Sequence, residues 1–462
     1  MTIDFTLDPA RRALQLDARR AASEVLSQVR AATHALHTPG ERFRATRPMY
    51  EEIIRRGFLR RLMPQPFGGE GTGMVDLAIV AEEFHAVDCN VSLTLFANLL
   101  GLAPLFIAGT PEQHRRLLAP FLACEGAPLA ALANSEPGGS ANFAAPRPGE
   151  GVRTRAERSE GGWRVHGTKQ WVSAATGWDG EGADLLSVVC RTDPEAPPEA
   201  ALSILVVRRG APGLVPLHDI DAMGHRAHLV PRFRLDGVAV PDADVVGPVG
   251  GARDIVEASF SGTAALVGIM GVGLMRAAFD VALRFAKTEC RGGALPIIEH
   301  QAVGYALADA KTTIEAARYL GWKACDAIDR QLPGALELAL QSKIFGSEAA
   351  VRVITDLMRV VGIESYDHEL PLAGLLQDAI ALPLFDGGNM GVRRRQLHCA
   401  AARGGLRPAH GRRHRLSTLV SCGWVPSRRI PSPRKREAKA PCPMPSRPSA
   451  PSTPTAIPNA WR

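Results

Sequence analysis

The sequence predicts an α+β fold that is mainly α, with an N-terminal helical domain, a middle antiparallel β domain and a C-terminal four-helix bundle. Three observations lead to this prediction. Apolar residues recur at helical spacing up to about residue 128, short apolar or alternating runs follow up to about residue 247, and long apolar helical patterns then return. We therefore expect domains at 1–128, 129–247 and 248–400, followed by a tail at 401–462.

The first domain is predicted from helical periodicity and helix-start signals. Apolar positions recur at helical spacing from Leu14 to Ala32, and a turn-rich stretch at 64–73 interrupts the pattern. Helices are expected at 74–87 and 91–108. Thr110 and Pro111 predict a further helix start, because Thr caps a helix well and Pro fits its first position.

The next two domains are predicted from a change of period. Short runs divided by Gly, Pro and Asp predict antiparallel strands at 129–133, 163–166, 185–190, 201–207 and 233–240. Long, largely apolar patterns then predict antiparallel helices at 255–287, 299–330, 334–361 and 370–379. The longest apolar run, 264–275, is shorter than the roughly 20 residues that cross a membrane, so we expect a buried helix and no membrane segment.

The net charge of +7 does not describe the whole chain. Residues 401–462 hold thirteen Lys or Arg and one acid, Glu437, so the rest is mildly acidic and nucleic-acid binding by the fold is not expected. The eight cysteines are scattered without a Cys-x-x-Cys pair, which predicts reduced thiols, no metal site and a cytoplasmic protein. The N-terminus shows no apolar signal segment.

Residues 382–396 have the composition of a functional site. Asp386 precedes two glycines, and Arg393 to Arg395 follow on the predicted first turns of a helix. Asp before Gly-Gly favours a tight turn and lets the backbone approach a flat ligand closely. Two interpretations stay open from these residues alone: the carboxylate of Asp386 caps the helix, or it acts as a catalytic base.

Two further segments could hold a cofactor. Residues 132–142 offer hydroxyls, a carboxamide and a glycine turn, which can bind a phosphate or a polar ring edge. At 169–173, Trp171 could stack on an aromatic cofactor, and the hydroxyl of Ser173 could bond its edge. The alternatives are an ordinary polar loop and a tryptophan that fills the core.

Two helical regions add polar candidates. Arg291 lies in a glycine-containing loop before His300 and Gln301, and Arg is the preferred bidentate ligand of phosphate, although a solvated loop would have the same composition. Thr263 lies in an apolar helical segment, where its hydroxyl could instead bond its own backbone. The sequence has no P-loop, no Gly-x-Gly-x-x-Gly after a strand and no His-Glu-x-x-His, so nicotinamide and zinc chemistry are not supported.

Several of these motifs resemble one family. The segment from Asp386 to Arg393 resembles the carboxylate-Gly-x-x-x-x-x-Arg segment near the end of the acyl-CoA dehydrogenase superfamily. The Asp, where most members have Glu, and the following Gly-Gly-Asn resemble the nitroalkane oxidase branch. The Ser-Glu-Pro segment that begins at Ser135 resembles the flavin loop of the family, and 169–173 resembles its Lys-x-Trp-x-Thr/Ser segment. The resemblance extends from about residue 4 to about residue 396.

This resemblance implies an activity and roles for three residues. The protein would use FAD and oxygen to convert nitroalkanes to aldehydes or ketones, with release of nitrite and hydrogen peroxide. Asp386 would remove the α-proton of the substrate, Arg393 would keep it ionised, and Thr263 would bond it where the branch has Ser. Two alternatives remain: an acyl-CoA dehydrogenase-like enzyme that acts on thioesters, and a scaffold whose basic tail binds nucleic acid or anionic surfaces.

The resemblance also implies FAD contacts and a homotetramer in which subunits share the cofactor. Arg291 and Gln301 would reach the FAD of a neighbouring subunit, and His300 would also contact FAD. The other expected FAD contacts are Leu132, Asn134, Ser135, Ser140, Ala141, Asn142, Trp171, Val172, Ser173, Thr355, Asp356, Leu357, Met358, Arg359, Leu384, Phe385, Gly387 and Gly388.

Residues 401–462 depart from the family and are expected to be disordered. Eleven of them are proline, and they have too few apolar side chains to offset the entropy of folding. The same composition results when GC-rich DNA is read out of frame, so the sequence leaves open whether this tail is native.

We predict that truncation after Ala400 leaves FAD content and turnover nearly unchanged, because the expected site lies wholly before this residue. Absorbance of bound flavin and steady-state rates would measure both. Lost activity on truncation, or strong hydrogen-exchange protection across 410–460, would contradict the prediction.

Overall fold

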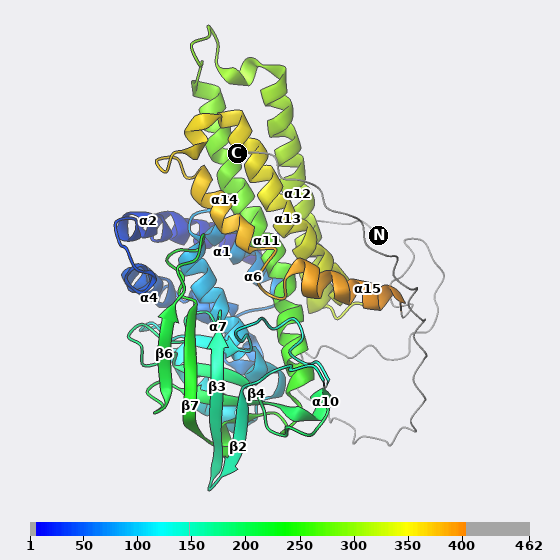
Figure 1. Ribbon diagram of the computed structural model, residues 1–462. Helices are drawn as coiled ribbons and strands as arrows, with labels where there is room; N and C mark the ends of the chain where they lie inside the picture. The colour runs from blue at the N-terminus through cyan, green and yellow to red at the C-terminus, as the bar shows by residue number, and fades with distance from the viewer. Residues whose placement is uncertain (1–5, 147, 403–462) are drawn as a thin grey trace, which may run out of the picture. The chain divides into compact units, whose positions relative to one another are not determined.

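Helices begin and end the described part of the chain, and strands lie between them (Figure 1). The structure, a computed structural model, describes residues 6–146 and 148–402, which all belong to one unit, Met1–Pro426. The predicted tail lies outside the described residues, except that the last helix continues to Ala402. The α+β, mainly α prediction is confirmed, whereas the division into three domains stays a prediction.

The first region consists of short helices around two longer ones. Thr110 caps its helix through a capping box with Gln113, and Pro111 occupies the first position, as predicted. The predicted break at 64–73 contains only a short 3₁₀ turn, Gln65–Phe67. The α-helices are α1 (Pro9–Glu24), α2 (Val29–Thr33), α3 (Pro39–Ala45), α4 (Arg47–Arg55), α5 (Phe58–Leu62), α6 (Met74–His85), α7 (Cys89–Ala108), α8 (Pro111–Leu117) and α9 (Ala119–Leu122).

The strands form one eight-stranded sheet in the described part of the chain, with the order β6-β7-β3-β2-β4-β5-β8 and β1 paired with β4. A short helix, α10 (Pro198–Ala201), precedes β5. The strands are β1 (Ala130–Ala133), β2 (Arg155–Ser159), β3 (Gly162–Gln170), β4 (Leu185–Arg191), β5 (Leu202–Arg208), β6 (Leu214–Asp219), β7 (Pro231–Pro241) and β8 (Val245–Val246).

The predicted antiparallel arrangement is wrong for β1. This strand pairs in parallel with β4, with Ala130 opposite Leu185, and β2 also meets β4 in parallel through Arg155 and Arg191. The β2–β3 hairpin lies between β1 and β4 in the sequence, and such a long connection permits the parallel pairing that a tight turn excludes. The strands β2, β6 and β8 were not predicted, because β2 is largely polar, β6 contains Pro216 and does not alternate, and β8 has only two residues.

The last region contains three long helices and two shorter ones. These are α11 (Ala252–Thr288), α12 (Gln301–Asp329), α13 (Ala335–Val361), α14 (Leu372–Ala381) and α15 (Arg394–Ala402). A π-helical turn, Asn389–Arg393, leads directly into α15. The apolar run Ala264–Met275 is buried throughout, as predicted.

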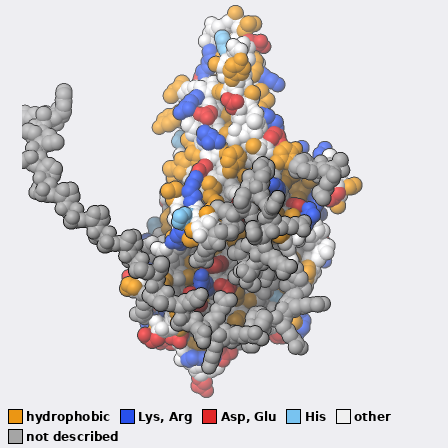
Figure 2. Space-filling model, turned by 90° about the vertical axis from the view of Figure 1, so that its right-hand side faces the viewer, with side chains coloured by type: hydrophobic (Ala, Val, Ile, Leu, Met, Phe, Trp, Pro, Cys, Tyr) orange, Lys and Arg blue, Asp and Glu red, His pale blue; other side chains and the backbone are white. Residues whose placement is uncertain are grey.

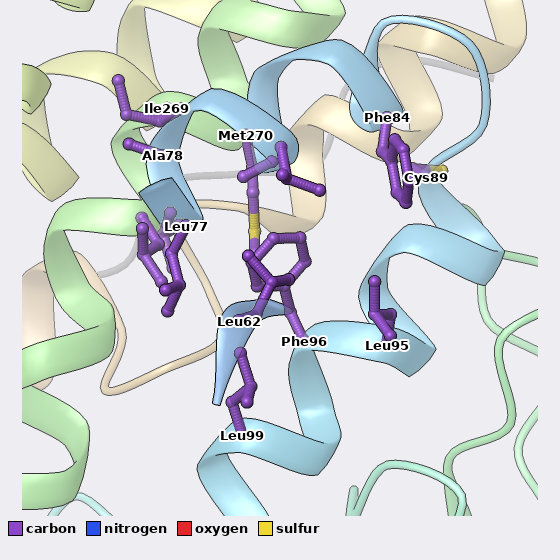
Figure 3. Packing of buried hydrophobic residues seen from close by; sticks show 14 of the residues in the cluster. Leu62, Leu77, Ala78, Phe84, Cys89, Leu95, Phe96, Leu99, Ile269 and Met270 are labelled. Atoms are coloured by element: carbon purple, nitrogen blue, oxygen red, sulfur yellow. The ribbon is translucent and has the colours of Figure 1, made fainter. Parts of the chain in front are cut away.

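One hydrophobic cluster joins the first helices to the last region, and a second lies among residues 131–240. Figure 3 shows side chains of the first cluster from α6, α7 and α11, among them Phe84, Phe96 and Met270. Among residues 6–146 and 148–402, two helices, α7 and α11, are long and apolar enough to cross a membrane by length and composition, and 67% of the most apolar window of each is buried inside the protein.

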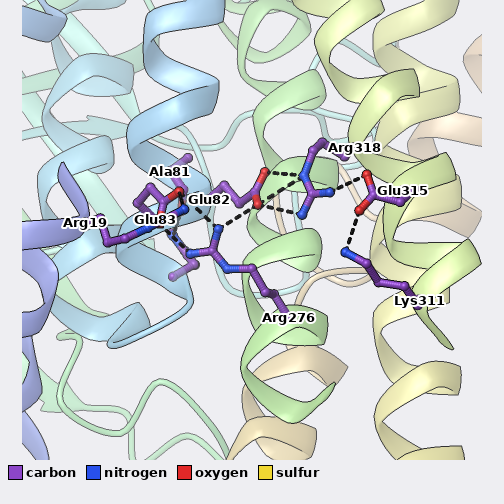
Figure 4. Close-up of polar contacts among 9 residues, drawn as sticks. Arg19, Ala81, Glu82, Glu83, Arg276, Lys311, Glu315 and Arg318 are labelled. Carbon is purple, nitrogen blue, oxygen red and sulfur yellow. Dashed lines mark hydrogen bonds and ion pairs between the residues drawn. The ribbon is translucent and has the colours of Figure 1, made fainter. Parts of the chain in front are cut away.

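Buried charges also connect α6 to α11 and α12 (Figure 4). Arg276 of α11 donates to Glu82 (2.8 Å) and Glu83 (2.6 Å), and Arg318 of α12 donates to Glu82 at 2.9 Å. Burial alone would raise the pKa of Glu83, but hydrogen bonds and charge from Arg19 and Arg276 lower it below its usual value. The ion pairs of Glu83 therefore stabilise the fold above the usual pKa of glutamate, and their contribution is lost as the pH falls through the lowered pKa of Glu83.

We predict that Arg276→Met lowers the free energy of unfolding by about 2–3 kcal/mol, because removal of one partner leaves a buried charge only partly compensated. Arg330→Met is the control, since its ion pair with Asp326 is exposed and worth about 1 kcal/mol or less. Urea unfolding followed by circular dichroism would compare the two. Equal losses in both variants would contradict a structural role for the buried charges.

Candidate active site

Asp386 lies in a strained turn between α14 and the π-helical turn. Its φ is +50° and that of Gly387 is +69°, so two successive residues adopt the left-handed conformation. Asp tolerates this region better than most residues, and Gly reaches it freely. A side chain at position 387 would also approach the guanidinium of Arg393, since a Cβ there would lie 3.1 Å from Nε. The turn predicted from Asp-Gly-Gly is therefore present.

The carboxylate of Asp386 is bonded on both oxygens, and its side chain is only 6% exposed. Thr263 Oγ1 donates to Oδ1 at 2.9 Å, and Arg393 Nη2 donates to Oδ2 at 3.0 Å. Thr263 Oγ1 also lies 3.2 Å from the carbonyl of Phe260, which is the longer of its two contacts. The structure thus brings the three predicted catalytic residues together. It shows no bond from the Asp386 side chain to the backbone at the start of the next helix, so the capping interpretation is not supported.

Each of the three consecutive arginines contacts a different element. Arg393 is buried and also donates to the backbone carbonyls of Asp386 and Phe260. Arg394 pairs with Glu348 of α13 at 2.6 Å. Arg395 donates to Asn142 Oδ1 at 2.7 Å and to the carbonyl of Ala141. The segment that carries Asp386 therefore contacts the predicted cofactor loop at 132–142.

A buried ion pair joins the two predicted cofactor segments. Lys169 is fully buried, and its Nζ donates to Glu136 Oε1 (2.9 Å) and to the backbone carbonyls of Asn134 (3.2 Å) and Val189 (2.8 Å). The backbone N–H of Gln170 donates to the carbonyl of Ser135 at 3.0 Å. Residues 132–142 and 169–173 therefore form one surface next to the Asp386 segment.

Two side chains on this surface, those of Asn134 and Trp171, are left with a polar atom or an aromatic ring that no described protein contact satisfies or covers. Asn134 is 3% exposed, yet its Oδ1 has no hydrogen-bond partner in the described part of the chain, and an unpaired buried oxygen is costly. Trp171 is 52% exposed and has a φ of +61°, so it does not fill the core. A flat cofactor with hydrogen-bonding edges would satisfy the amide and cover the indole ring.

The Ser173 hydroxyl is oriented by a buried histidine. Thr94 Oγ1 donates to the carbonyl of Asn90, so it accepts from Nδ1 of His228 at 2.9 Å. Burial lowers the pKa of His228 to about 3, and the neutral ring accepts from Ser173 Oγ through Nε2 at 3.0 Å. This contact was not predicted, because it joins α7 to two separate segments of the β region. It leaves the lone pairs of Ser173 free for a ligand.

The remaining residues of the predicted cofactor set lie around these contacts. Leu132 lies in β1 and is buried, Val172 is buried, and the hydroxyls of Ser135 and Ser140 lie 3.1 Å apart. Leu384 is exposed, whereas the Phe385 ring meets the ring of His225 edge-on with centroids 6.0 Å apart.

A second group of predicted residues lies elsewhere. Arg291 follows α11 and donates to the carbonyl of Val361 and to Glu364, near the end of α13. The α11–α12 connection lies at the top of Figure 1, away from the strands and from α15. No described hydrogen bond or ion pair joins this group to the Asp386 turn. Its members are Arg291, His300 and Gln301, together with Thr355, Asp356, Leu357, Met358 and Arg359, of which Leu357 is buried in the core.

Two buried lysines near the site were not predicted as functional. Lys169 was noted only as part of its motif, and Lys343 of α13 was not noted at all. Lys343 occurs three residues after Leu340 and three before Gly346, on the buried stripe of the helix. A lysine at an apolar helical position is the signal that could have identified it, because a buried ammonium needs partners.

Comparisons with known proteins identify the family. Three family models match in order: the N-terminal domain of acyl-CoA dehydrogenase at 8–125, its middle domain at 131–238 and its C-terminal domain at 250–401. The fold is therefore the acyl-CoA dehydrogenase fold.

Individual relatives show which branch of this family the chain resembles. The chain is 41% identical to a nitroalkane oxidase of Podospora anserina over 86% of this chain and 95% of that one, and 37% identical to one of Fusarium oxysporum over 86% and 94%. A solved nitroalkane oxidase active-site variant, crystallised with 1-nitrohexane, superposes with a TM-score of 0.84 at 37% identity, over 87% of this chain and 97% of that one. The chain therefore belongs to the acyl-CoA dehydrogenase family, in the branch that contains the nitroalkane oxidases.

Proposed function

We propose that this protein is an FAD-dependent oxidase that converts primary or secondary nitroalkanes to aldehydes or ketones. The observation that supports this most directly is the buried Asp386 carboxylate, bonded by Thr263 and Arg393, in a chain 41% identical to a nitroalkane oxidase. Oxygen and water are consumed, and nitrite and hydrogen peroxide are released.

The proposed role of Asp386 is to accept the α-proton of the substrate. The α-carbon of a nitroalkane is far more acidic than that of a thioester, so an ordinary carboxylate suffices as the base if it is ionised at the working pH. The guanidinium of Arg393 favours the ionised form. The hydroxyl of Thr263 fixes one oxygen, which leaves the other lone pairs of the carboxylate available to the proton.

FAD fits the surface formed by 132–142 and 169–173. The unpaired Oδ1 of Asn134, the exposed ring of Trp171 and the oriented hydroxyl of Ser173 are groups that a flavin can satisfy. A similar solved protein is described as the flavoprotein nitroalkane oxidase. When bound, FAD supplies the oxidation of the deprotonated substrate and passes the electrons to oxygen.

The alternative substrate class is an acyl-CoA thioester, which other members of the family act on: a cyclohex-1-ene-1-carbonyl-CoA dehydrogenase of Geobacter metallireducens is 29% identical over 73% of the chain. Steady-state assays of nitroethane and of acyl-CoA thioesters, with oxygen uptake and nitrite as readouts, separate the two. Turnover of the thioester alone would overturn the proposal.

We predict that Asp386→Asn retains FAD but reduces it ~10²–10⁴-fold more slowly with neutral nitroalkane, the usual cost of losing a general base. A preformed nitronate is already deprotonated and should reduce the variant at nearly the parent rate. Stopped-flow absorbance of the flavin measures both reactions. Asp326→Asn, an exposed carboxylate of α12, is the control. Equal loss with both substrates would show that Asp386 is not the base.

We further propose a cytoplasmic homotetramer in which Arg291 and Gln301 contact the FAD of a neighbouring subunit. Their position away from Asp386 supports this, since one chain alone gives them no flavin to bind. Figure 2 shows hydrophobic side chains among charged ones on the face turned toward the viewer. On α12 and α13, the large hydrophobic side chains of Tyr305, Tyr319 and Phe345 are exposed. The described cysteines are all free, which supports a reducing compartment.

We predict that dilution of the oligomer into monomers releases FAD, because the cofactor would lose its contacts from the neighbouring chain. Light scattering and the fluorescence of free flavin would follow both events. Arg291→Leu should weaken FAD binding, whereas Arg284→Leu, at an exposed position of α11, should not. A monomer that keeps stoichiometric FAD at nanomolar concentration would contradict the arrangement.

A further inference from the structure

The turn that carries Asp386 needs support from outside itself. Residues 386 and 387 are both left-handed, and such a conformation persists only where surrounding contacts enforce it. The turn closes on itself through one backbone bond near its ends, from the N–H of Asn389 to the carbonyl of Pro383 at 2.8 Å. Arg393 and Thr263 hold the carboxylate, but they do not hold the two ends of the turn.

Lys343 holds both ends. This residue of α13 is fully buried, and its Nζ donates to the carbonyl of Leu382 at 3.1 Å and to Oδ1 of Asn389 at 3.2 Å. Leu382 is the first residue after α14, and Asn389 is the first residue of the π-helical turn. One ammonium group therefore connects Leu382 and Asn389, which lie on either side of Asp386 in the turn.

The same face of α13 completes this attachment. Asn389 Nδ2 donates to Ser347 Oγ and to Glu348 Oε1, both at 3.0 Å, and Glu348 also binds Arg394. Ser347 follows Lys343 by four residues, so the two lie on one side of the helix, and Glu348 is the residue next to Ser347. The side chain of Asn389 is thus fixed at its oxygen by Lys343 and at its nitrogen by the next turn.

Lys343 also lies among the charges of the site. Burial lowers the pKa of Lys343 to about 8. The negative charges of Asp386 and Glu348 act in the opposite direction and raise this pKa, whereas the positive charge of Arg393 lowers it further. These are the charged groups that face the ammonium. Its protonated form makes the stronger hydrogen bonds and partly balances two carboxylates. The lysine bonds the ends of the turn and not the Asp386 side chain, so it acts on the carboxylate through the turn.

We propose that Lys343 is a positioning residue for Asp386, and that its buried ammonium holds the turn in the geometry in which the carboxylate meets the substrate proton. This inference rests on the proposed function of Asp386 as the base. It assigns to α13 a part in catalysis that neither the Asp386 motif nor the cofactor segments contain.

The test compares neutral nitroalkane with preformed nitronate. Lys343→Met removes the ammonium but keeps an unbranched apolar chain, and we expect flavin reduction by neutral nitroalkane to slow by about 10–10²-fold, since a misplacement of about 1 Å can have this effect. Reduction by nitronate and FAD content should stay near the parent values, because neither needs an aligned base. The matched control is Lys323→Met, at an exposed position of α12.

A second variant and the pH profile keep the test decisive if Lys343→Met folds poorly. Asn389→Ala removes one acceptor of Lys343 and should give a smaller loss, again confined to neutral nitroalkane. For the parent, the rate with freshly mixed neutral nitroalkane should fall as the pH rises through about 8, where Lys343 loses its proton. This decline should be absent from Lys343→Met.

Three outcomes would overturn the proposal: unchanged rates in both variants, equal losses with nitroalkane and nitronate, or the same alkaline decline in Lys343→Met. Failure of the proposed function itself would differ from all of these. It would appear in Asp386→Asn as an equal loss with both substrates.

Discussion

The buried ion pair between Arg393 and Asp386 is the interaction on which the arrangement of the site depends. Arg393 is the largest fully buried side chain in the described part of the chain, and a buried guanidinium is tolerated only when its charge and its N–H groups are satisfied. The carboxylate and backbone carbonyl of Asp386, with the carbonyl of Phe260, provide most of those partners. Arg393 therefore ties the turn to α11 and holds the carboxylate in an interior position.

Other charged side chains connect the Asp386 turn to the elements around it. Arg394 and Lys343 attach the turn to α13, and Arg395 attaches it to the loop at 132–142. The Lys169–Glu136 pair then connects that loop to 169–173 inside the sheet. Elements from the helical and strand regions thus meet at one place through charged side chains, some buried and some exposed, each with a specific partner. Apolar packing alone would bring the same elements together but would not fix the direction of a carboxylate or a hydroxyl.

Much of the candidate site was predicted from the sequence. A residue could be predicted when it stands in a local motif, and it was missed when its role depends on a partner far away in the sequence. Asp386, Trp171 and Ser173 stand in local motifs, where residue type and spacing indicate a turn or an aromatic surface. Thr263 was expected to reach Asp386 only through the family resemblance, and the contact is present at 2.9 Å. His228 leaves no local signal, and the local signal of Lys343, a lysine on an apolar helical stripe, does not reveal its partners, because the partners of both residues are distant in the sequence.

By itself the sequence determined the order of helices, strands and helices, the turn at Asp386 and the burial of α11, since periodicity and glycine placement are local properties of the chain. It did not determine the parallel pairing of β1 with β4, which depends on how the connecting hairpin crosses the sheet. Nor did it determine which of the three consecutive arginines binds Asp386, because that choice depends on the π-helical turn and on carbonyls and carboxylates brought near by α11, α13 and the sheet. Only the tertiary structure makes this selection, since buried charges require partners and packing decides which partners are within reach.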